Sequence, residues 1–238
     1  MLYVGSTDNR MYAIYTSNQA AGTVRWTVNT TAPIAAAAAF SLDMSTLYFQ
    51  SNSLYALDAV DGRMLWSLYM VAAISPRTPP LVGPDSTIYA AYGSPTYLSV
   101  AAVYGRGPNV GKVNFVISVN SGGMALDADG SLYVNELNSN SLQAYYTYGP
   151  YAGKMDWSFS IATSSNPILV NSTLIAGTWN NALYGVCTQE SCASQLQWSL
   201  QLPKGASSHL FSAGTASADG SRLFVGSLDY SVYCVALT

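Results

Sequence analysis

The chain has 238 residues, of which 50% are hydrophobic and only 9% are charged, against about a quarter in an ordinary soluble domain. The net charge of −3, with no basic cluster, excludes a nucleic-acid-binding protein, because phosphate contacts need concentrated Lys and Arg. The longest apolar runs, 33–40 and 68–74, are too short for a membrane helix of about 20 residues. The length permits one large domain or two small ones.

A short apolar run opens the chain and recurs along it, with tyrosine at the second position in four of its six copies. Copies of this run begin near residues 2, 47, 88, 132, 174 and 223. About nine residues later a second apolar run follows each copy, at 11–14, 54–57, 97–100, 141–144, 183–186 and 232–235. Short polar segments separate the two runs, which predicts a β-hairpin in every repeat.

A third run carries a large aromatic residue. The five aromatics are spaced by 40, 49, 42 and 41 residues: Trp26, Trp66, Phe115, Trp157 and Trp198. Four positions before each of the first four stands a glycine, and Ser194 takes that place in the fifth. Apolar residues also occur two positions before and two after each aromatic, so we predict a half-buried strand entered through a glycine turn. The period of the aromatics assigns them to packing between repeats.

A fourth, weaker run of small and apolar residues precedes the first run of the next repeat, at 34–40, 80–82, 122–126, 167–170 and 210–216. It ends in a turn with an Asp or Asn: Asp43, Asp85, Asp129, Asn171 or Asp219. Such a side chain bonds the backbone two residues on, which explains its presence at a turn. Four strands in about 40 residues, without helical periodicity, predict an all-β fold of four-stranded antiparallel blades, a β-propeller.

The segment Leu54–Trp66, LYALDAVDGRMLW, resembles the repeat of the quinoprotein, or PQQ-repeat, β-propeller superfamily. The resemblance covers essentially the whole chain in six copies. It implies the propeller fold but leaves function open, since that superfamily includes dehydrogenases, assembly lipoproteins, sensor domains and scaffolds.

We predict one propeller domain over residues 1–238, with six repeats. The first blade lacks its strand A and the sixth lacks its strand D. Two interpretations remain: a six-blade ring with a thin seam, or a piece of a parent with seven or eight blades. We favour a six-blade arc or ring within a longer protein, because Met1 directly precedes a strand, as in a truncated or processed product.

The three cysteines bear on compartment. Cys187 and Cys192 flank one predicted hairpin turn, where a disulfide would fit, and free thiols are the alternative. Cys234 falls at a position held by Ala13, Ala56 and Gly185 in other repeats, so we expect an inert, buried thiol. With two Asn-x-Thr/Ser-type sequons, at 29–31 and 171–173, and the low charge, this favours a secreted or periplasmic protein.

The residues of catalysis and metal binding are scarce. The one histidine, His209, lacks the partners of a metal set or a catalytic triad. Asp129 within 127–130 recurs in register in other repeats, which indicates a turn and not a calcium loop. Quinoprotein dehydrogenases of the superfamily use adjacent cysteines, calcium ligands and a catalytic Asp, none of which we can match. We therefore expect no cofactor, with PQQ and calcium only under the enzyme alternative.

Departures from the repeat consensus mark a candidate binding face at the turns between the first two runs and at the links between repeats. The candidate partner-binding residues are Asp8, Arg10, Arg77, Trp179, Lys204, His209, Asp229 and Tyr230. Trp179 is out of register with the five blade aromatics, and exposed tryptophans often anchor interfaces. Packing over its own hairpin is the alternative. On the opposite side, the loops 103–111 and 147–153 are rich in Tyr, Gly and Pro, and their tyrosines are suited to sugars or peptides; a solubilising surface is the alternative.

The sequence favours a non-catalytic propeller that serves as a scaffold for a protein or peptide partner outside the cytoplasm, with no membrane span and no nucleic acid. The first alternative is a fragment of a PQQ- and calcium-dependent quinoprotein oxidoreductase. The second is a carbohydrate-binding propeller with a glycan as its ligand.

Overall fold

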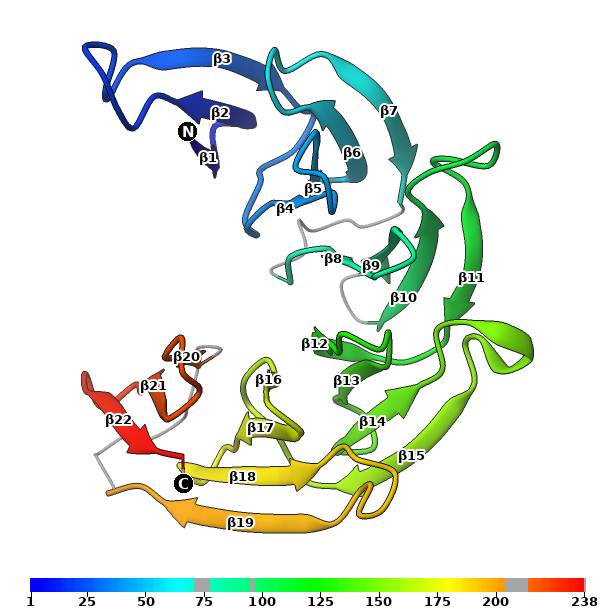
Figure 1. Ribbon diagram of the computed structural model, residues 1–238, viewed down its shortest axis with the longest axis vertical. Helices are drawn as coiled ribbons and strands as arrows, with labels where there is room; N and C mark the ends of the chain where they lie inside the picture. The colour runs from blue at the N-terminus through cyan, green and yellow to red at the C-terminus, as the bar shows by residue number, and fades with distance from the viewer. Residues whose placement is uncertain (71–77, 95–96, 204–213, 238) are drawn as a thin grey trace. The chain divides into compact units, whose positions relative to one another are not determined.

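The computed structural model of the protein describes residues 1–70, 78–94, 97–203 and 214–237. These ranges contain six antiparallel sheets of three or four strands and one short 3-10 turn, η1 (Gly149–Tyr151) (Figure 1). The chain divides into two compact units, Met1–Val119 and Asn120–Thr238. The predicted all-β class is confirmed.

The first unit contains three blades. Their strands, in chain order, are β1 (Leu2–Gly5), β2 (Arg10–Ile14) and β3 (Val24–Asn29); β4 (Ala39–Phe40), β5 (Thr46–Gln50), β6 (Ser53–Asp58) and β7 (Met64–Tyr69); and β8 (Leu81–Val82), β9 (Thr87–Ser94), β10 (Tyr97–Tyr104) and β11 (Val113–Ile117). In every sheet the spatial order follows the chain order, so each strand pairs with the next by an antiparallel hairpin.

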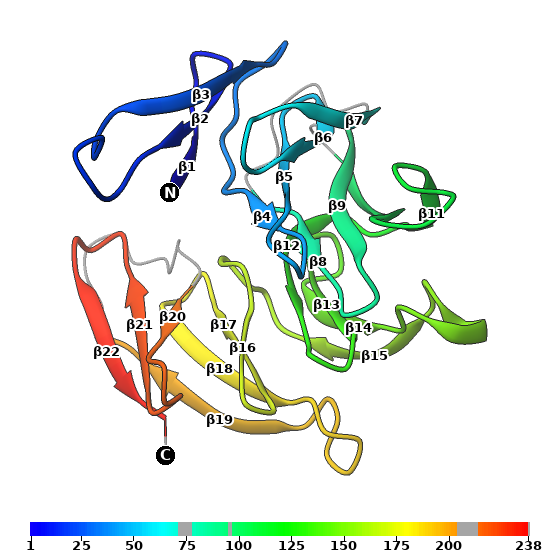
Figure 2. The same ribbon diagram turned by 45° about the horizontal axis from the view of Figure 1, so that its top comes forward.

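The second unit repeats this arrangement (Figure 2). Its strands are β12 (Ser121–Leu126), β13 (Leu132–Glu136), β14 (Ser141–Tyr145) and β15 (Met155–Ser160); β16 (Ile168–Val170), β17 (Thr173–Gly177), β18 (Ala182–Cys187) and β19 (Leu196–Gln201); and β20 (Thr215–Ala216), β21 (Arg222–Gly226) and β22 (Val232–Ala236). As predicted, the first sheet lacks strand A, and the described residues of the sixth contain no strand D. The predicted repeat is therefore the four-stranded blade of a β-propeller.

The A strand of the second blade is much shorter than predicted. Of the run 34–40, only Ala39 and Phe40 pair with β5. The N–H of Ile34 instead donates to the carbonyl of Ser6 in the preceding blade, at 3.0 Å. The start of the run therefore joins two blades and does not extend its own sheet. Residues 210–213 of the last predicted A strand lie outside the described residues.

The turn between strands C and D has the same geometry in five blades. Its key residue is left-handed in every copy, with φ of 84° at Gly22, 76° at Gly62, 78° at Gly111, 79° at Gly153 and 62° at Ser194. Glycine adopts this conformation without steric cost, which explains its recurrence. A β-bulge follows in each of the five C–D pairs, a feature that the sequence periodicity did not reveal.

Within a blade, a B-strand tyrosine and the D-strand tryptophan meet across a small C-strand residue. In the second blade Tyr48 pairs with Ala56, and Ala56 pairs with Trp66. The rings of Tyr48 and Trp66 lie 5.9 Å apart. Tyr3 and Trp26, and Tyr133 and Trp157, repeat this contact at 5.7 and 5.8 Å. The small residue is required because a larger side chain would hold the two rings apart.

The prediction that Cys234 is buried was wrong, since its thiol is free and exposed. Cys234 does occupy the small C-strand position, opposite Phe224 on β21. In the other blades a D-strand aromatic covers this position, whereas no described strand pairs with the outer edge of β22. The alignment was correct, but burial depends on a strand that the described part of the sixth blade does not contain.

Neighbouring blades pack through the D-strand tryptophans. Trp26 lies against the next blade, where its Nε1 donates to the carbonyl of Ala59 at 3.3 Å and its ring faces Gly62. Trp66 lies in the same way against Gly111. Each of the contacts between neighbouring blades within a unit also contains a cluster of buried apolar residues. The predicted structural role of these tryptophans follows from the contacts that they make.

Candidate functional site

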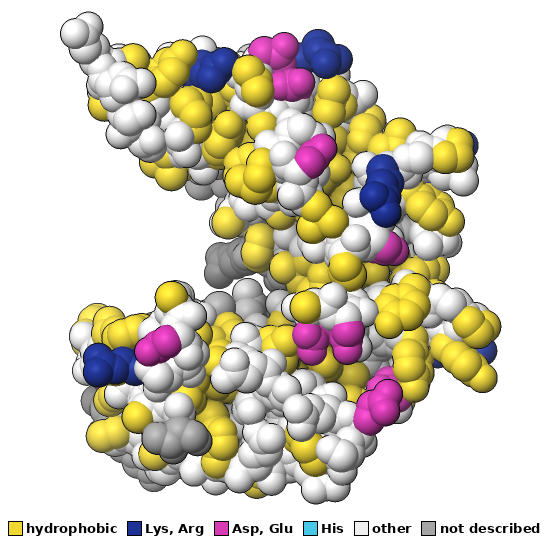
Figure 3. Space-filling model, viewed as in Figure 1, with side chains coloured by type: hydrophobic (Ala, Val, Ile, Leu, Met, Phe, Trp, Pro, Cys, Tyr) yellow, Lys and Arg dark blue, Asp and Glu magenta, His cyan; other side chains and the backbone are white. Residues whose placement is uncertain are grey.

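The structure describes five of the eight candidate partner-binding residues. Asp8 lies in the β1–β2 turn of the first unit, and Arg10 is the first residue of β2. Trp179 lies in the β17–β18 turn of the second unit, and Asp229 and Tyr230 lie in its β21–β22 turn. Arg77, Lys204 and His209 lie outside the described residues. Charged side chains are sparse on the face that Figure 3 presents, as the composition predicts.

The three B–C turns that carry these candidates are the same structure. In each, a Ser or Thr N–H donates to the carbonyl four residues on: Ser6 to Arg10, Thr178 to Ala182, and Ser227 to Ser231. Asp8 and Asp229 each accept the backbone N–H two residues later, at 3.1 and 3.0 Å. These two carboxylates therefore act within their own turns.

A tyrosine hydroxyl completes each of the two aspartate turns. Tyr12 donates to Asp8 and Tyr233 donates to Asp229, both at 2.5 Å. The bond from Tyr12, with a smaller contribution from Ser6, lowers the pKa of Asp8, and the bond from Tyr233 lowers the pKa of Asp229. Both carboxylates therefore stay ionised at neutral pH, and the turns that present Arg10 and Tyr230 are held by hydrogen bonds.

Tyr230 is unusual in both conformation and exposure. Its φ is 65°, and the equivalent residues of the two other turns, also left-handed, are Asn9 and Asn181. Asparagine tolerates this conformation, whereas other side chains pay a steric cost. The side chain of Tyr230 is also fully exposed. Neither the fold nor the turn accounts for a tyrosine here, which makes it the strongest of the predicted binding residues.

Trp179 lies in the corresponding turn of the adjacent blade. Its side chain is 48% exposed and lines a cavity of about 400 Å³ together with Ile161 and Tyr184. The half-exposed indole is compatible with both interpretations of Trp179, packing over its own hairpin and contact with a partner. A rigid turn that presents a half-exposed tryptophan is suited to an interface.

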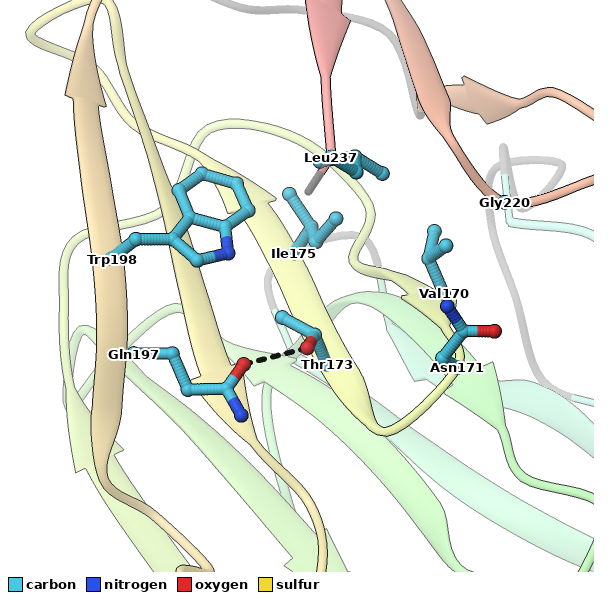
Figure 4. Close-up of a pocket in the computed structure, with 8 residues that line it drawn as sticks. All are labelled: Val170, Asn171, Thr173, Ile175, Gln197, Trp198, Gly220 and Leu237. Carbon is cyan, nitrogen blue, oxygen red and sulfur yellow. Dashed lines mark hydrogen bonds between the residues drawn. The ribbon is translucent and has the colours of Figure 1, made fainter.

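A second cavity of about 590 Å³ lies between the last two blades, and Figure 4 shows Trp198, Ile175 and Leu237 around it. Thr173 donates to Gln197 at its margin, at 2.6 Å. In the first unit the glycine of the next C–D turn covers the equivalent tryptophan. The equivalent tryptophan of the fifth blade, Trp198, lines this cavity. We therefore assign this cavity to blade packing.

A third cavity, of about 640 Å³, lies between the C–D loops of the fourth and fifth blades. We call it the tyrosine groove and define it by Tyr146, Tyr148, Tyr151, Asp129, Asp156 and Glu190. The predicted tyrosine-rich loop 147–153 forms one wall. A disulfide joins Cys187 and Cys192, whose Cα atoms lie 5.7 Å apart, and closes the short loop that carries Glu190 on the other wall.

Glu136 is a buried carboxylate that the sequence analysis missed. It ends β13 with 7% exposure and accepts backbone N–H groups of Asn138 at 3.0 Å, Asn120 at 3.3 Å and Ser139. Burial acts to raise its pKa, but the hydrogen bonds from Ser139, Asn138 and Asn120 outweigh burial and hold the pKa below its ordinary value of 4.5. Glu136 therefore anchors the β13–β14 turn in its ionised form.

Glu136→Gln is expected to lower the free energy of unfolding at pH 7 by about 1–2 kcal/mol, because a neutral amide oxygen is a weaker acceptor for these donors. The pKa of Glu136 is lower in the folded protein than its ordinary value of 4.5. The ionised carboxylate therefore stabilises the fold above pH 4.5, and this stabilisation is lost as the pH falls through the folded pKa. Urea unfolding of both proteins between pH 7 and pH 3 measures this. A stability difference that does not change with pH would contradict the assignment.

Within the described ranges, no group of three or more His, Cys, Asp or Glu side chains is arranged to hold a metal ion. The side chain of Asp129 accepts a hydrogen bond from the backbone N–H of Ser131 at 2.9 Å, which is the contact expected of a turn residue. None of the helical segments in those ranges is long and apolar enough to cross a bilayer.

Comparison with known proteins supports the resemblance that the repeats indicate. Residues 1–107 match a family model described as outer membrane protein assembly factor BamB. The structure is similar to BamB from Moraxella catarrhalis, with 17% identity and a TM-score of 0.74 over 99% of this chain and 69% of that one. The chain is thus similar to PQQ-repeat β-propellers, in sequence over residues 1–107 and in fold over nearly its whole length. The resemblance predicted from Leu54–Trp66 is thereby confirmed.

Two further solved structures are also similar to this chain. Sqt1 from Chaetomium thermophilum has 13% identity and a TM-score of 0.81 over 98% of this chain and 65% of that one. Sqt1 bound to the N-terminus of ribosomal protein L10 has 14% identity and a TM-score of 0.79, over 99% and 67%. No curated protein matches the sequence. This chain thus spans about two thirds of these structures, and at such identities they show the fold alone.

Proposed function

We propose that the protein is a non-catalytic scaffold that binds a protein or peptide partner through the B–C turns of its blades. The observation that carries this proposal is Tyr230, a fully exposed aromatic side chain on a left-handed residue. The adjacent blade presents Trp179 in the equivalent turn. Tyrosine and tryptophan are enriched among residues that dominate binding energy, and rigid turns lose little entropy on association.

Two similar proteins support this class of function. The family model that matches residues 1–107 describes an assembly factor, and Sqt1 has been solved in complex with the N-terminus of a ribosomal protein. We also propose an extracytoplasmic location, supported by the disulfide between Cys187 and Cys192. Its test is thiol labelling of unreduced protein from its source, which should modify Cys234 alone.

The variant Tyr230→Asn tests the proposed face, because it installs the residue that the two equivalent turns carry. We expect the free energy of unfolding to rise by about 0.5–1 kcal/mol, since asparagine tolerates the left-handed backbone. Combined with Trp179→Ala, it is expected to reduce capture of the partner from an extract of the source organism about tenfold or more. Quantitative mass spectrometry of the retained proteins measures the capture.

The matched control is Tyr69→Ala, which removes an exposed tyrosine from β7 and should leave capture unchanged. Equal capture by the wild type and by the double variant would refute the face. Titration with PQQ and Ca²⁺ addresses the enzyme alternative, because a saturable change in cofactor absorbance would contradict a non-catalytic scaffold.

A further inference from the structure

The tyrosine groove has aromatic walls that face solvent. Tyr148 and Tyr151 are exposed, and Tyr146 is partly so. The rings of Tyr146 and Tyr151 lie 5.8 Å apart at an angle of 44°. The ring of Tyr148 lies over Gly130, where an added Cβ would come within 3.1 Å of it. Glycine at position 130 thus leaves room for the ring of Tyr148, and Tyr151 belongs to the turn η1.

The groove is also negatively charged. Asp129, Asp156 and Glu190 line it, and no described lysine or arginine lies within ion-pair distance of these carboxylates. Tyr146 donates a hydrogen bond to Asp156 at 2.6 Å, and this bond raises the pKa of Tyr146, with smaller effects of burial and of the charges of Asp156 and Glu190. Figure 3 shows acidic side chains beside hydrophobic-class side chains, which include tyrosine, over the part of the second unit with β13, β14 and β15.

A cation of the chain itself already uses one of these rings. The Nζ atom of Lys154 lies 5.6 Å from the centroid of Tyr151. An ammonium or guanidinium group is attracted to the face of an aromatic ring within about 6 Å. The groove therefore presents tyrosine ring faces, and the ring of Tyr151 already interacts with a cation. Its three carboxylates form no ion pair with a described lysine or arginine.

We propose that the tyrosine groove binds a basic side chain, arginine or lysine, from an extended segment of a protein partner. The guanidinium or ammonium group lies between the tyrosine faces, and Glu190 and Asp156 balance its charge. This site is separate from the B–C turns and extends the proposed scaffold to a second contact surface. A sugar ring prefers a flat, open platform, whereas Tyr146 and Tyr151 are tilted toward each other.

Isothermal titration of the full chain with acetyl-Gly-Arg-Gly-Arg-Gly-amide tests the proposal. We expect saturable binding below about 1 mM. The same peptide with citrulline in place of arginine keeps the shape but not the charge, and should bind at least about fivefold more weakly. Raising the salt concentration to 0.5 M should weaken binding of the arginine peptide, because the groove is open to solvent.

Two variants and two controls locate the site. Tyr151→Ala and Glu190→Gln are each expected to weaken binding of the arginine peptide about fivefold or more. Tyr69→Ala and Asp61→Asn remove an exposed tyrosine and an exposed carboxylate from the other unit, and should leave it unchanged. Tyr230→Asn should also leave it unchanged, which separates this site from the proposed B–C face.

Three results would overturn the proposal. They are equal affinity for the citrulline peptide, no saturable binding of the arginine peptide, or binding that Tyr151→Ala and Glu190→Gln do not alter. Saturable binding of a glycan on an array, lost in Tyr151→Ala while the arginine peptide does not bind, would assign the groove to carbohydrate instead.

Discussion

Replacing Gly62 by alanine is expected to lower the free energy of unfolding by about 2–4 kcal/mol, through two separate effects. The residue has a φ of 76°, which is strained for any side chain with a Cβ. The added Cβ would also lie 2.7 Å from Cδ2 of Trp26, so the indole must leave the position in which it joins the first two blades.

Two other glycines form a matched series with Gly62. Gly22 has a φ of 84° and open space around its Cβ position, so Gly22→Ala carries the backbone strain alone and should cost about 1 kcal/mol. Gly111 has a φ of 78° and an added Cβ 3.2 Å from Trp66, and its variant should fall between the two. Urea unfolding followed by tryptophan fluorescence measures the series. Equal losses at Gly22 and Gly62 would show that the tryptophan contact contributes nothing.

Gln50→Leu is expected to lower the free energy of unfolding by about 2–4 kcal/mol, because it leaves two buried backbone groups without a partner. Strand β8 pairs with β9 at Ile88 and Tyr89. Farther along β9, the side-chain amide of Gln50 reaches across from the second blade. Its Nε2 donates to the carbonyl of Ala91 at 2.8 Å, and its Oε1 accepts the N–H of Ala91 at 3.3 Å. Both residues are almost completely buried.

The control is Asn135, which occupies the same position of its B strand in the fourth blade. Its Oδ1 has no hydrogen-bond partner, and its Nδ2 makes a long contact of 3.4 Å with the carbonyl of Ser165. Asn135→Leu is therefore expected to change the free energy of unfolding by less than about 1 kcal/mol. Thermal and urea unfolding of the two variants compare them. A loss at Asn135 as large as at Gln50 would show that hydrogen bonding by the Gln50 amide is not the cause.

The glycine and glutamine predictions differ in how far the sequence could anticipate them. The recurrence of Gly22, Gly62 and Gly111 before an aromatic residue was visible as a pattern, because all repeats use the same turn. Gln50 had no such signal, since the other B strands carry Gly, Ala or Asn at its position. Its role arises from a carbonyl and an N–H 41 residues away, which no local pattern encodes.

The candidate site likewise contains some features that the sequence predicts and others that depend on contacts between distant residues. Trp179 and Tyr230 were predicted because they depart from a repeat that is otherwise regular, and the structure adds that Tyr230 is left-handed and fully exposed. The loop 147–153 was recognised as rich in tyrosine. That Glu190 lies opposite it, on a loop closed by the disulfide, follows from the packing of two blades.

By itself the sequence determined the order of strands within each blade, the hairpin turns and the resemblance to PQQ-repeat propellers. These features depend on alternation with a period of two and on turn residues, both of which act over a few neighbouring positions. Only the tertiary structure revealed the short A strand of the second blade, the exposure of Cys234, the hydrogen bonds of the Gln50 amide and the carboxylates of the tyrosine groove. Each of these depends on which groups from distant repeats meet, or fail to meet, in space. The low content of charged residues agrees with the burial of sheet faces between blades. Three of the few carboxylates nevertheless line one groove in the second unit.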